Sequence, residues 1–293
     1  MSDRPLADLH LHSSISDGDL EPEALVDAAR EAGMEVIALT DHDTVSGLER
    51  AVARGRELGI EVIEGCELTA YVGRIEIHLL AYFFGLAHGP LHALIDAVVR
   101  YRRERALQMG RQLSAAGYAI TDEEILHVGR HAHALGQPHV AEALVRRGYV
   151  RDRLDAFRLF LNEGRIGHVP KKNLTPADVI RAVHASGGIV SLAHPGLAPH
   201  DELIAGLCGQ GLDALEAAYP AHHEANRRFY DGLARRYEKG VSGGSDFHGP
   251  KMRPDIRIGA AGVTKAQLAD LRRRARARRG SRAGPPAGAG ASQ

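Results

Sequence analysis

"ADLHLHSSISDGDLEPEALVDAAREAG", residues 7–33, decides the fold because it joins a short apolar strand to an amphipathic helix. Pro22 suits the first turn of that helix, and Gly33 suits its carboxyl end. The same strand and helix rhythm returns from "EVIALT" at 35–40 and from "GGIVSLAHP" at 187–195. Repeated units of this kind are typical of a parallel sheet or an α/β barrel. We therefore expect a barrel of the α/β class.

The rhythm is interrupted between residues 90 and 170, where consecutive helical patterns run without a strand between them. This predicts a helical insertion at 90–170 in a barrel made of residues 1–89 and 171–264. We expect the segments before and after Val72 and Gly73 to pair as a hairpin. Residues 265–293 read as a basic helix followed by a Gly/Pro/Ala tail, disordered from about residue 280. The arginine run at 272–279 is expected to be a solvated face.

Charge and cysteine content exclude several classes of protein. The 293 residues carry 37 basic and 37 acidic side chains, so the whole molecule has no electrostatic attraction to nucleic acid or membranes. Two cysteines, Cys66 and Cys208, are too few for a disulfide framework and fit a reducing compartment. No signal peptide and no run of about 20 apolar residues is evident. We expect a cytoplasmic protein with no membrane contact and no obligate protein partner.

Histidines and carboxylates collect where predicted strands end. His10 and His12 stand two residues apart on one strand, so both side chains point to the same face. Later strand ends supply the other candidate ligands, which are Asp41, His42, Asp43, Glu67, His78, His194, Asp246 and His248. Such nitrogen and oxygen donors, without thiolates, suit zinc, manganese or iron. The set exceeds what one ion takes, so we expect two or three ions, with manganese favoured and Glu67 able to bridge.

Paired divalent ions about 3.5 to 4 Å apart suit phosphoester hydrolysis because they activate a water and stabilise the leaving oxygen. A hydroxide activated by the metal is then the expected nucleophile, and no catalytic side chain is assigned. Neither a G-x-S-x-G elbow nor a G-x-x-x-x-G-K-[ST] loop occurs in the sequence, which leaves serine hydrolases and nucleotide-triphosphate switches without support.

Six short segments, in order along the chain, resemble the motifs of the polymerase and histidinol phosphatase (PHP) family of metallophosphoesterases. They are "DLHLHSSISDG", "ALTDHDTVSG", "GCELTA", "IHLLAY", "LAHPG" and "GGSDFHG". The resemblance implies a distorted (β/α)7 barrel with metals at the carboxyl ends of the strands. It implies three ligand sets: His10, His12, Glu67 and Asp246; Glu67, His78 and His194; and Asp17, His42 and His248. Asp41 and Asp43 flank a ligand, and we expect them to orient it.

The insertion resembles that of small bacterial family members that remove the 3'-phosphate from nucleoside 3',5'-bisphosphates, and of relatives that trim short RNA from its 5' end. In those proteins the insertion caps the metal site and supplies arginines that bind phosphate. The match in "RRERALQMG" implies that Arg102 and Arg105 grip a 5'-phosphate. Gln137 stands where relatives commonly carry arginine. His139 and Lys171, with Lys172, are candidates to compensate.

These observations predict hydrolysis of adenosine 3',5'-bisphosphate to AMP and phosphate. The alternatives are a 5'-3' exoribonuclease acting on short 5'-phosphorylated RNA, a phosphatase like histidinol phosphatase, a degenerate PHP module without activity, and an RNA-associated module bound through the arginine-rich tail. The remaining histidines are expected to be solvated or structural, and these are His88, His92, His127, His131, His133, His222 and His223. Asp19 is expected to act only in the turn before the first helix.

Overall fold

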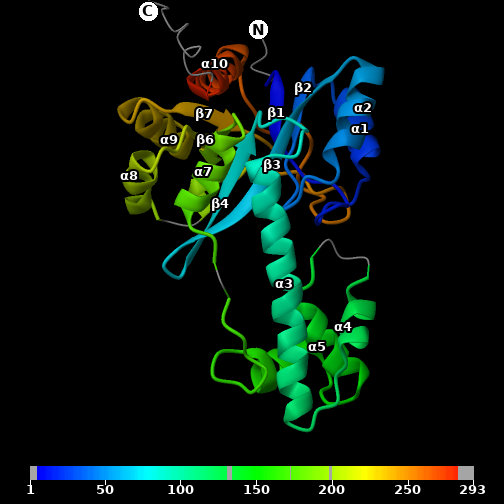
Figure 1. The fold of residues 1–293 in the computed structure, drawn as a ribbon. Helices are drawn as coiled ribbons and strands as arrows, with labels where there is room; N and C mark the ends of the chain where they lie inside the picture. The colour runs from blue at the N-terminus through cyan, green and yellow to red at the C-terminus, as the bar shows by residue number, and fades with distance from the viewer. Residues whose placement is uncertain (1–4, 131–133, 172, 198–199, 283–293) are drawn as a thin grey trace, which may run out of the picture. The chain divides into compact units, whose positions relative to one another are not determined.

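Seven strands form one mixed sheet among the residues that the computed structural model describes, which are 5–130, 134–171, 173–197 and 200–282 (Figure 1). The strands are β1 (Ala7–Leu11), β2 (Val36–Leu39), β3 (Glu61–Val72), β4 (Ile75–Tyr82), β5 (Ile189–Leu192), β6 (Ala214–Ala218) and β7 (Gly240–Gly243). They pair in chain order, and all pairs are parallel except those that β4 makes with β3 and β5.

The sheet curls into a nearly closed barrel because its first strand meets the segment after its last one. The amide of Asp246 donates to the carbonyl of His10 at 2.8 Å, and the amide of His12 donates to the carbonyl of Phe247 at 3.0 Å. Tyr82, fully buried, donates its hydroxyl to the carbonyl of Leu9 at 2.8 Å. The expected (β/α)7 barrel is therefore confirmed.

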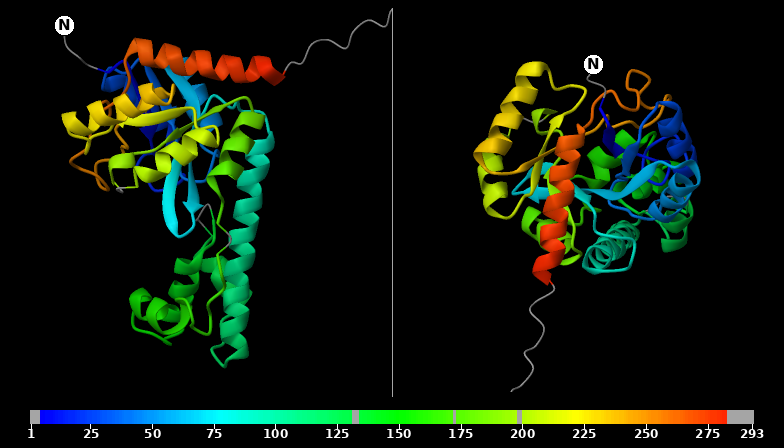
Figure 2. Two further views of the ribbon diagram at one scale, coloured as in Figure 1. Left: turned by 90° about the vertical axis from the view of Figure 1, so that its left-hand side faces the viewer. Right: turned by 90° about the horizontal axis from the view of Figure 1, so that it is seen from above.

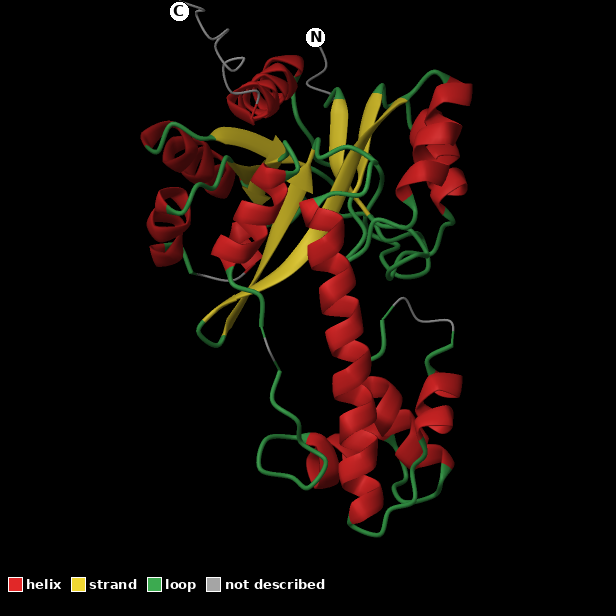
Figure 3. Ribbon diagram, in the orientation of Figure 1, coloured by secondary structure: helices red, strands yellow, loops and turns green. Residues whose placement is uncertain are grey.

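The helices fall into two groups, drawn in red in Figure 3. The barrel carries α1 (Pro22–Glu31), α2 (Leu48–Leu58), α7 (Pro176–Ala185), the short turn η2 (Pro195–Leu197), α8 (Glu202–Gly209), α9 (Glu224–Arg236) and α10 (Lys265–Arg282). The other group is α3 (Pro90–Ala115), α4 (Asp122–Val128), α5 (Gln137–Arg146), α6 (Arg153–Ala156) and the π-type turn η1 (Phe157–Leu161). No helix among the described residues is long and apolar enough to cross a membrane.

The chain divides into two compact units, of which residues 93–173 form the smaller. This helical unit has a core of its own, in which Met109, Leu113 and Ile125 are fully buried. At its α4, the Thr121 side chain accepts from the amide of Glu124, and the Glu124 carboxylate accepts from the amide of Thr121. This capping box starts a helix that includes His127. His131, His133 and Lys172 lie outside the described residues.

Glu67 and His78 do not lie at the ends of their strands, which corrects the expectation from the sequence. β3 pairs with β2 only as far as Glu64, and β4 pairs with β5 only from Leu79 onward, so residues 69–78 form a two-stranded hairpin that turns at Gly73 and Arg74. Glu67 makes an isolated bridge to His42 where the parallel pairing stops. β4 runs antiparallel to β3 and β5, so its amino end lies at the same edge as their carboxyl ends. His78 comes just before the residues of β4 that pair with β5, and it therefore lies at that edge.

Helix α10 belongs to the barrel, so its arginines do not form a solvated face along their whole length. Leu268, Leu271 and Ala275 are buried in the cluster that contains Ala7 and Leu9. Figure 2 shows α10 lying across one end of the barrel. Its arginines reach groups at the edge opposite the candidate ligands, since Arg278 pairs with Asp213 at 2.8 Å and Arg274 donates to the carbonyl of Glu238 at 3.0 Å.

Residues 280–282 are helical, whereas we had expected disorder from about residue 280. Residues 283–293 of the expected tail lie outside the described part of the chain.

Candidate metal centre

Glu67 lies at the centre of the cluster, fully buried, with an imidazole against each of its oxygens. Its Oε2 is 3.0 Å from His10 Nε2, 3.2 Å from His12 Nε2 and 3.4 Å from His42 Nδ1. Its Oε1 is 2.8 Å from His78 Nδ1 and 3.1 Å from His194 Nε2. Burial raises the pKa of Glu67, but the charge of His10 and hydrogen bonds from the imidazoles hold it well below its usual range. One carboxylate thus connects five imidazoles from four segments of the chain.

The first group comprises His10, His12, Glu67 and Asp246, all buried, whose donor atoms lie within 4.8 Å of one another. Asp246 Oδ1 is 3.3 Å from His10 Nε2 and 3.2 Å from His12 Nε2. Burial opposes the charge on Asp246, but His10 and His12 lower the pKa of its carboxyl. The structure brings together the four residues that the resemblance assigned to one ion.

The second group differs in part from the expected set of Glu67, His78 and His194. The compact trio in the structure is His42, Glu67 and His78. His194 still contacts Glu67, and its ring packs edge-on to that of His78 at 5.3 Å between centroids. His42 therefore lies between two groups, which the sequence did not indicate.

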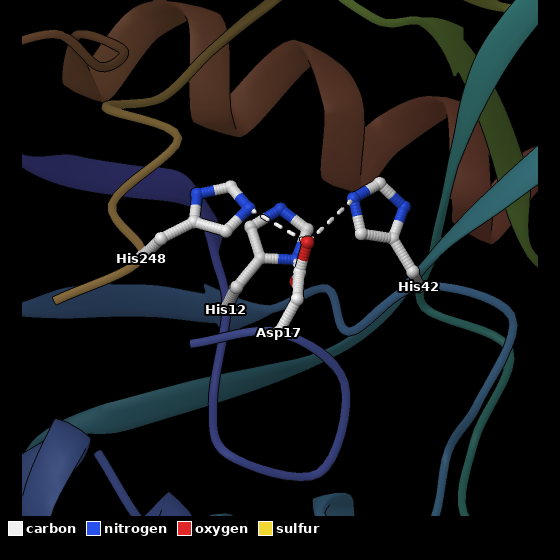
Figure 4. A group of neighbouring side chains, drawn as sticks. All are labelled: His12, Asp17, His42 and His248. Atoms are coloured by element: carbon white, nitrogen blue, oxygen red, sulfur yellow. Dashed lines mark ion pairs between the residues drawn. The ribbon is translucent and has the colours of Figure 1, made fainter. Parts of the chain in front are cut away.

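The third group comprises His12, Asp17, His42 and His248 (Figure 4). Asp17 Oδ2 lies 3.4 Å from His248 Nε2 and 3.7 Å from His42 Nε2. His12 Nδ1, 3.7 Å from Asp17 Oδ1, adds a donor to the three that we expected. Burial raises the pKa of Asp17, but the hydrogen bond from His248 and the neighbouring imidazoles lower it to about 2.

His12 provides the test of whether these residues suit a cation. Its ring is fully buried, and neither nitrogen makes a well-oriented hydrogen bond to any described residue, although Nε2 lies 3.2 Å from Glu67. Buried polar atoms without partners are rare, and an ion between donors relieves them. Burial lowers the pKa of His12, but Asp246 and Glu67 raise it to about 9. A cluster of imidazoles and carboxylates with unsatisfied nitrogens fits divalent cations.

Asp41 and Asp43 hold loops. Asp41 accepts from the amide and hydroxyl of Ser13 at 2.7 and 2.6 Å, and from the hydroxyl of Ser16 at 2.7 Å. It thereby orients the loop that carries Asp17, where we had expected it to orient His42. Asp43, at a φ of 51°, accepts from the amide of Thr69 at 3.0 Å and fixes the loop that follows β2 against β3.

Sequence reasoning missed three buried groups beside the ligands. Glu216 lies 3.0 Å from His10 Nδ1, and Tyr219 donates its hydroxyl to Asp246 Oδ2 at 2.9 Å. Asp8 accepts from the amides of Ser245 and Gly259 at 2.9 and 2.8 Å, and burial raises its pKa to about 6. The signal for Glu216 was a single carboxylate within the apolar run "ALEAAY", and its buried position required an explanation.

Asp19, expected to act only in its own turn, and His222, expected to be solvated or structural, both connect distant segments. Asp19 accepts from the amides of Lys251 and Met252 at 2.5 and 3.0 Å, so it anchors the loop that follows His248. His222, nearly fully buried, lies beneath the turn that follows His194, where its Nε2 accepts from the amide of Gly196 at 3.0 Å. Both residues support the cluster from outside it.

The candidate residues for substrate binding lie in the helical unit. Arg102 Nη2 lies beside Gly136 at the start of α5, and burial together with this arginine lowers the pKa of His139. Two others hold the unit's own backbone: Arg105 Nε donates to the carbonyl of Val169 at 2.8 Å, and Gln137 Nε2 donates to that of Leu161 at 2.7 Å. Lys171 is exposed. Of these side chains, the structure gathers Arg102 and His139.

Comparison with known proteins places the chain among phosphoesterases. The PHP domain model matches residues 8–101. A phosphoribosyl 1,2-cyclic phosphate 1,2-diphosphodiesterase from Eggerthella lenta is 33% identical over 83% of this chain and 94% of its own. A 3',5'-nucleoside bisphosphate phosphatase from Chromobacterium violaceum is 32% identical, covering 83% and 87%. A 5'-3' exoribonuclease from Haemophilus influenzae is 34% identical, covering 83% and 90%.

Solved structures agree with these relatives. A Bifidobacterium adolescentis chain described as a metal-dependent phosphoesterase has a TM-score of 0.69 at 28% identity, covering 93% of this chain and 98% of its own. A Chromobacterium violaceum amidohydrolase with bound sulfate has a TM-score of 0.66 at 30% identity, covering 92% and 96%. The resemblance seen in the sequence motifs is confirmed, and the chain belongs to the PHP family of metal-dependent phosphoesterases.

Proposed function

We propose that the protein removes the 3'-phosphate from nucleoside 3',5'-bisphosphates, with adenosine 3',5'-bisphosphate giving AMP and phosphate. The observation that carries the proposal is the arrangement of imidazoles and carboxylates around the buried carboxylate of Glu67. A relative of 32% identity over 83% of the chain is a phosphatase of this substrate class. The motif match at Arg102 and Arg105 favours a substrate with a second phosphate.

The chain's own residues define where ions would sit and which charge they would meet. The group of His10, His12, Glu67 and Asp246 would hold one, the residues around His78 a second, and Asp17 with His42 and His248 a third. When bound, divalent ions supply an activated water and charge neutralisation for the phosphoryl oxygens. Glu67, whose low pKa keeps it ionised, would hold two of the groups at a fixed separation. We favour manganese, and the same donors would also accept zinc or iron according to supply.

Recognition of the 5'-phosphate is assigned to the helical unit. Arg102 and Arg105 are three residues apart on α3, which puts both on one face of that helix. Arg105 donates to the carbonyl of Val169, whereas Arg102 lies beside Gly136 and acts on His139, so we assign the contact with the substrate phosphate first to Arg102. His139 beside it supplies a further donor. Gln137 already donates to Leu161, so we assign it a structural contribution to this surface.

A second candidate activity is phosphodiester cleavage. The exoribonuclease relative is 34% identical and the cyclic phosphate diphosphodiesterase relative 33%, values close to that of the bisphosphatase. All three reactions transfer a phosphoryl group to water, so the cluster around Glu67 serves each of them equally. The difference lies in what surrounds the reacting phosphate.

The test is a substrate panel with the purified chain, run with Mn²⁺ and with Zn²⁺. The panel contains adenosine 3',5'-bisphosphate, a short 5'-phosphorylated RNA, phosphoribosyl 1,2-cyclic phosphate and histidinol phosphate, and both phosphate release and AMP are measured. We expect the highest kcat/KM with the bisphosphate, and we expect it to depend on Glu67. If the bisphosphate releases no phosphate while another substrate is cleaved, the substrate assignment is wrong. If none is cleaved with either ion, the activity itself is wrong.

A further inference from the structure

Strand β6 supplies none of the predicted ligands, although each of the other six strands supplies one or is followed closely by one. β6 and the turn after it nevertheless supply three buried side chains that reach the cluster: Glu216, Tyr219 and His222. Two of them contact ligands directly, since Glu216 meets His10 and Tyr219 donates to Asp246. The side chains of β6 and of the turn after it therefore contact the ligands and are not predicted ligands themselves.

Glu216 uses both of its oxygens. Oε1 lies 3.0 Å from His10 Nδ1, and Oε2 accepts from the backbone amide of His194 at 2.7 Å. The side chain is fully buried, so no water competes for either oxygen. With both oxygens engaged, Glu216 is not placed to be a ligand itself. It contacts His10, of the first group, and His194, which the sequence assigned to the second group and which contacts Glu67.

The contact at His10 fixes which nitrogen carries the proton. When an ion occupies the first group, the Nδ1–H of His10 would donate to Glu216, which reserves the lone pair of Nε2 for the ion. Nε2 lies 3.0 Å from Glu67 Oε2 and 3.3 Å from Asp246 Oδ1, so the free lone pair points into the first ligand group. A histidine that binds metal through one nitrogen commonly donates its other N–H to a carboxylate.

The contact at His194 fixes its backbone. His194 has a φ of 25°, in the left-handed region that side chains other than glycine rarely adopt. Glu216 accepts from its amide, and two residues further on the amide of Gly196 donates to His222 Nε2 at 3.0 Å. His222 is held in turn, because its Nδ1 donates to the carbonyl of Ala217 in β6 at 2.9 Å. These contacts maintain the unusual conformation that aims His194 Nε2 at Glu67.

We propose that Glu216 is a positioning residue that fixes the tautomer of His10 and the backbone of His194, and so prepares two ligand groups for divalent ions at once. The inference rests on the metal centre of the proposed function. Replacing Glu216 by glutamine keeps the shape but offers one acceptor and one donor. If the amide NH₂ faces His10, that imidazole must present a lone pair at Nδ1 and a proton at Nε2, which blocks the ion. If it faces His194, the strained amide there loses its acceptor.

The experiment measures Mn²⁺ binding to metal-free protein by isothermal titration calorimetry in wild type and Glu216→Gln. We expect Mn²⁺ affinity to fall roughly ten- to hundredfold, the range found when carboxylates behind metal-bound histidines are removed. Asp213→Asn is the matched control, since Asp213 is a buried carboxylate directly before β6 whose described contacts are His184, Val190 and Arg278. That variant should bind Mn²⁺ as wild type does.

Two outcomes overturn the inference: Glu216→Gln with wild-type affinity for Mn²⁺, or Asp213→Asn with an equal loss. If Glu216→Gln does not fold, Glu216→Asp is titrated instead. It keeps the charge but is one methylene shorter, so it should retain one of the two contacts and bind Mn²⁺ with reduced affinity. An unchanged affinity of this variant likewise refutes the inference. The substrate panel is independent, because wild-type protein that binds Mn²⁺ but cleaves no bisphosphate contradicts the proposed function and leaves this inference standing.

Discussion

Replacing Asp213 by asparagine tests how the carboxyl-terminal helix is fixed to the barrel. Asp213 is 5% exposed and accepts from His184 Nε2 at 2.7 Å, from the amide of Val190 at 3.0 Å and from Arg278 Nη2 at 2.8 Å. Asparagine has the same shape but no charge, and its NH₂ must face at least one of these donors. The variant therefore leaves a buried donor without an acceptor and Arg278 without its partner.

The size of the effect follows from burial. Removing one partner of a fully buried ion pair destabilises a protein by about 3 to 5 kcal/mol. The side chain of Arg278 is 39% exposed and that of His184 is 19% exposed, so water screens part of the loss. We expect a loss of about 2 to 3 kcal/mol, which corresponds to a fall in Tm of roughly 5 to 10 °C for a domain of this size.

The effect should depend on pH. Burial raises the pKa of Asp213, but hydrogen bonds from His184 and Arg278 lower it overall below its ordinary value of 3.8. A lowered pKa in the folded state means that ionised Asp213 contributes stability above the pKa of the unfolded chain, and that this contribution is lost as pH falls through the folded value. The difference in Tm between wild type and Asp213→Asn should therefore be constant near neutral pH and shrink below about pH 4.

The assay is thermal unfolding across pH, followed by calorimetry and by circular dichroism. Arg181→Ala is the control, because it removes a surface pair with Asp178 in which both side chains are exposed, and it should change stability by less than about 1 kcal/mol. If Asp213→Asn has the same Tm as Arg181→Ala, or if its loss of Tm relative to wild type grows at low pH, the reasoning about this ion pair is wrong.

Four further outcomes are expected. Glu67→Gln should lose Mn²⁺ binding in calorimetry and hydrolysis in the phosphate assay, and wild-type binding would contradict the central position of this carboxylate. Chelation of wild-type protein should lower its Tm, because ligands that bind only the folded state stabilise it by mass action, whereas Glu67→Gln should show no such response. Arg102→Ala should raise KM for adenosine 3',5'-bisphosphate roughly ten- to hundredfold, as for a lost hydrogen bond to a charged group, and Arg111→Ala, which removes a surface pair, should not. Leu271→Ala should cost about 2 to 5 kcal/mol in urea unfolding, since Leu271 is fully buried, and Leu154→Ala, exposed at 76%, should be neutral.

The positions of the candidate ligands were accessible from sequence because parallel strands end at one edge of a barrel. His10 and His12 share a face by strand alternation alone, and His42, His194 and Asp246 follow short apolar runs. Glu67 and His78 were found for a partly wrong reason. They lie within strands, because the hairpin of β3 and β4 extends past the barrel, and only the reversed direction of β4 brings His78 to the right edge.

The remaining features depend on contacts that no local pattern encodes. Glu216 is 206 residues from His10 along the chain, and nothing near it in sequence indicates that partner. The arginines of α10 read as a solvated face because charge runs usually are, whereas Arg278 reaches a carboxylate 65 residues away. The pairing of His12 with Asp17 and His248 was missed for the same reason. Composition and periodicity describe what a segment prefers, while these contacts depend on which segments the barrel brings together.

The closure of the barrel also affects the order in which the chain can fold. β1 completes its pairing only when Phe247 and Val263 are present, and its side chains Ala7 and Leu9 pack in the cluster that contains Leu268 and Leu271. During synthesis the first strand therefore leaves the ribosome long before its final neighbours exist. Until they appear, one edge of β1 and the apolar groups that α10 covers remain exposed. A nascent chain lacking its last helix should be the form that chaperones retain, and truncation before Lys265 should give aggregation in place of a smaller soluble enzyme.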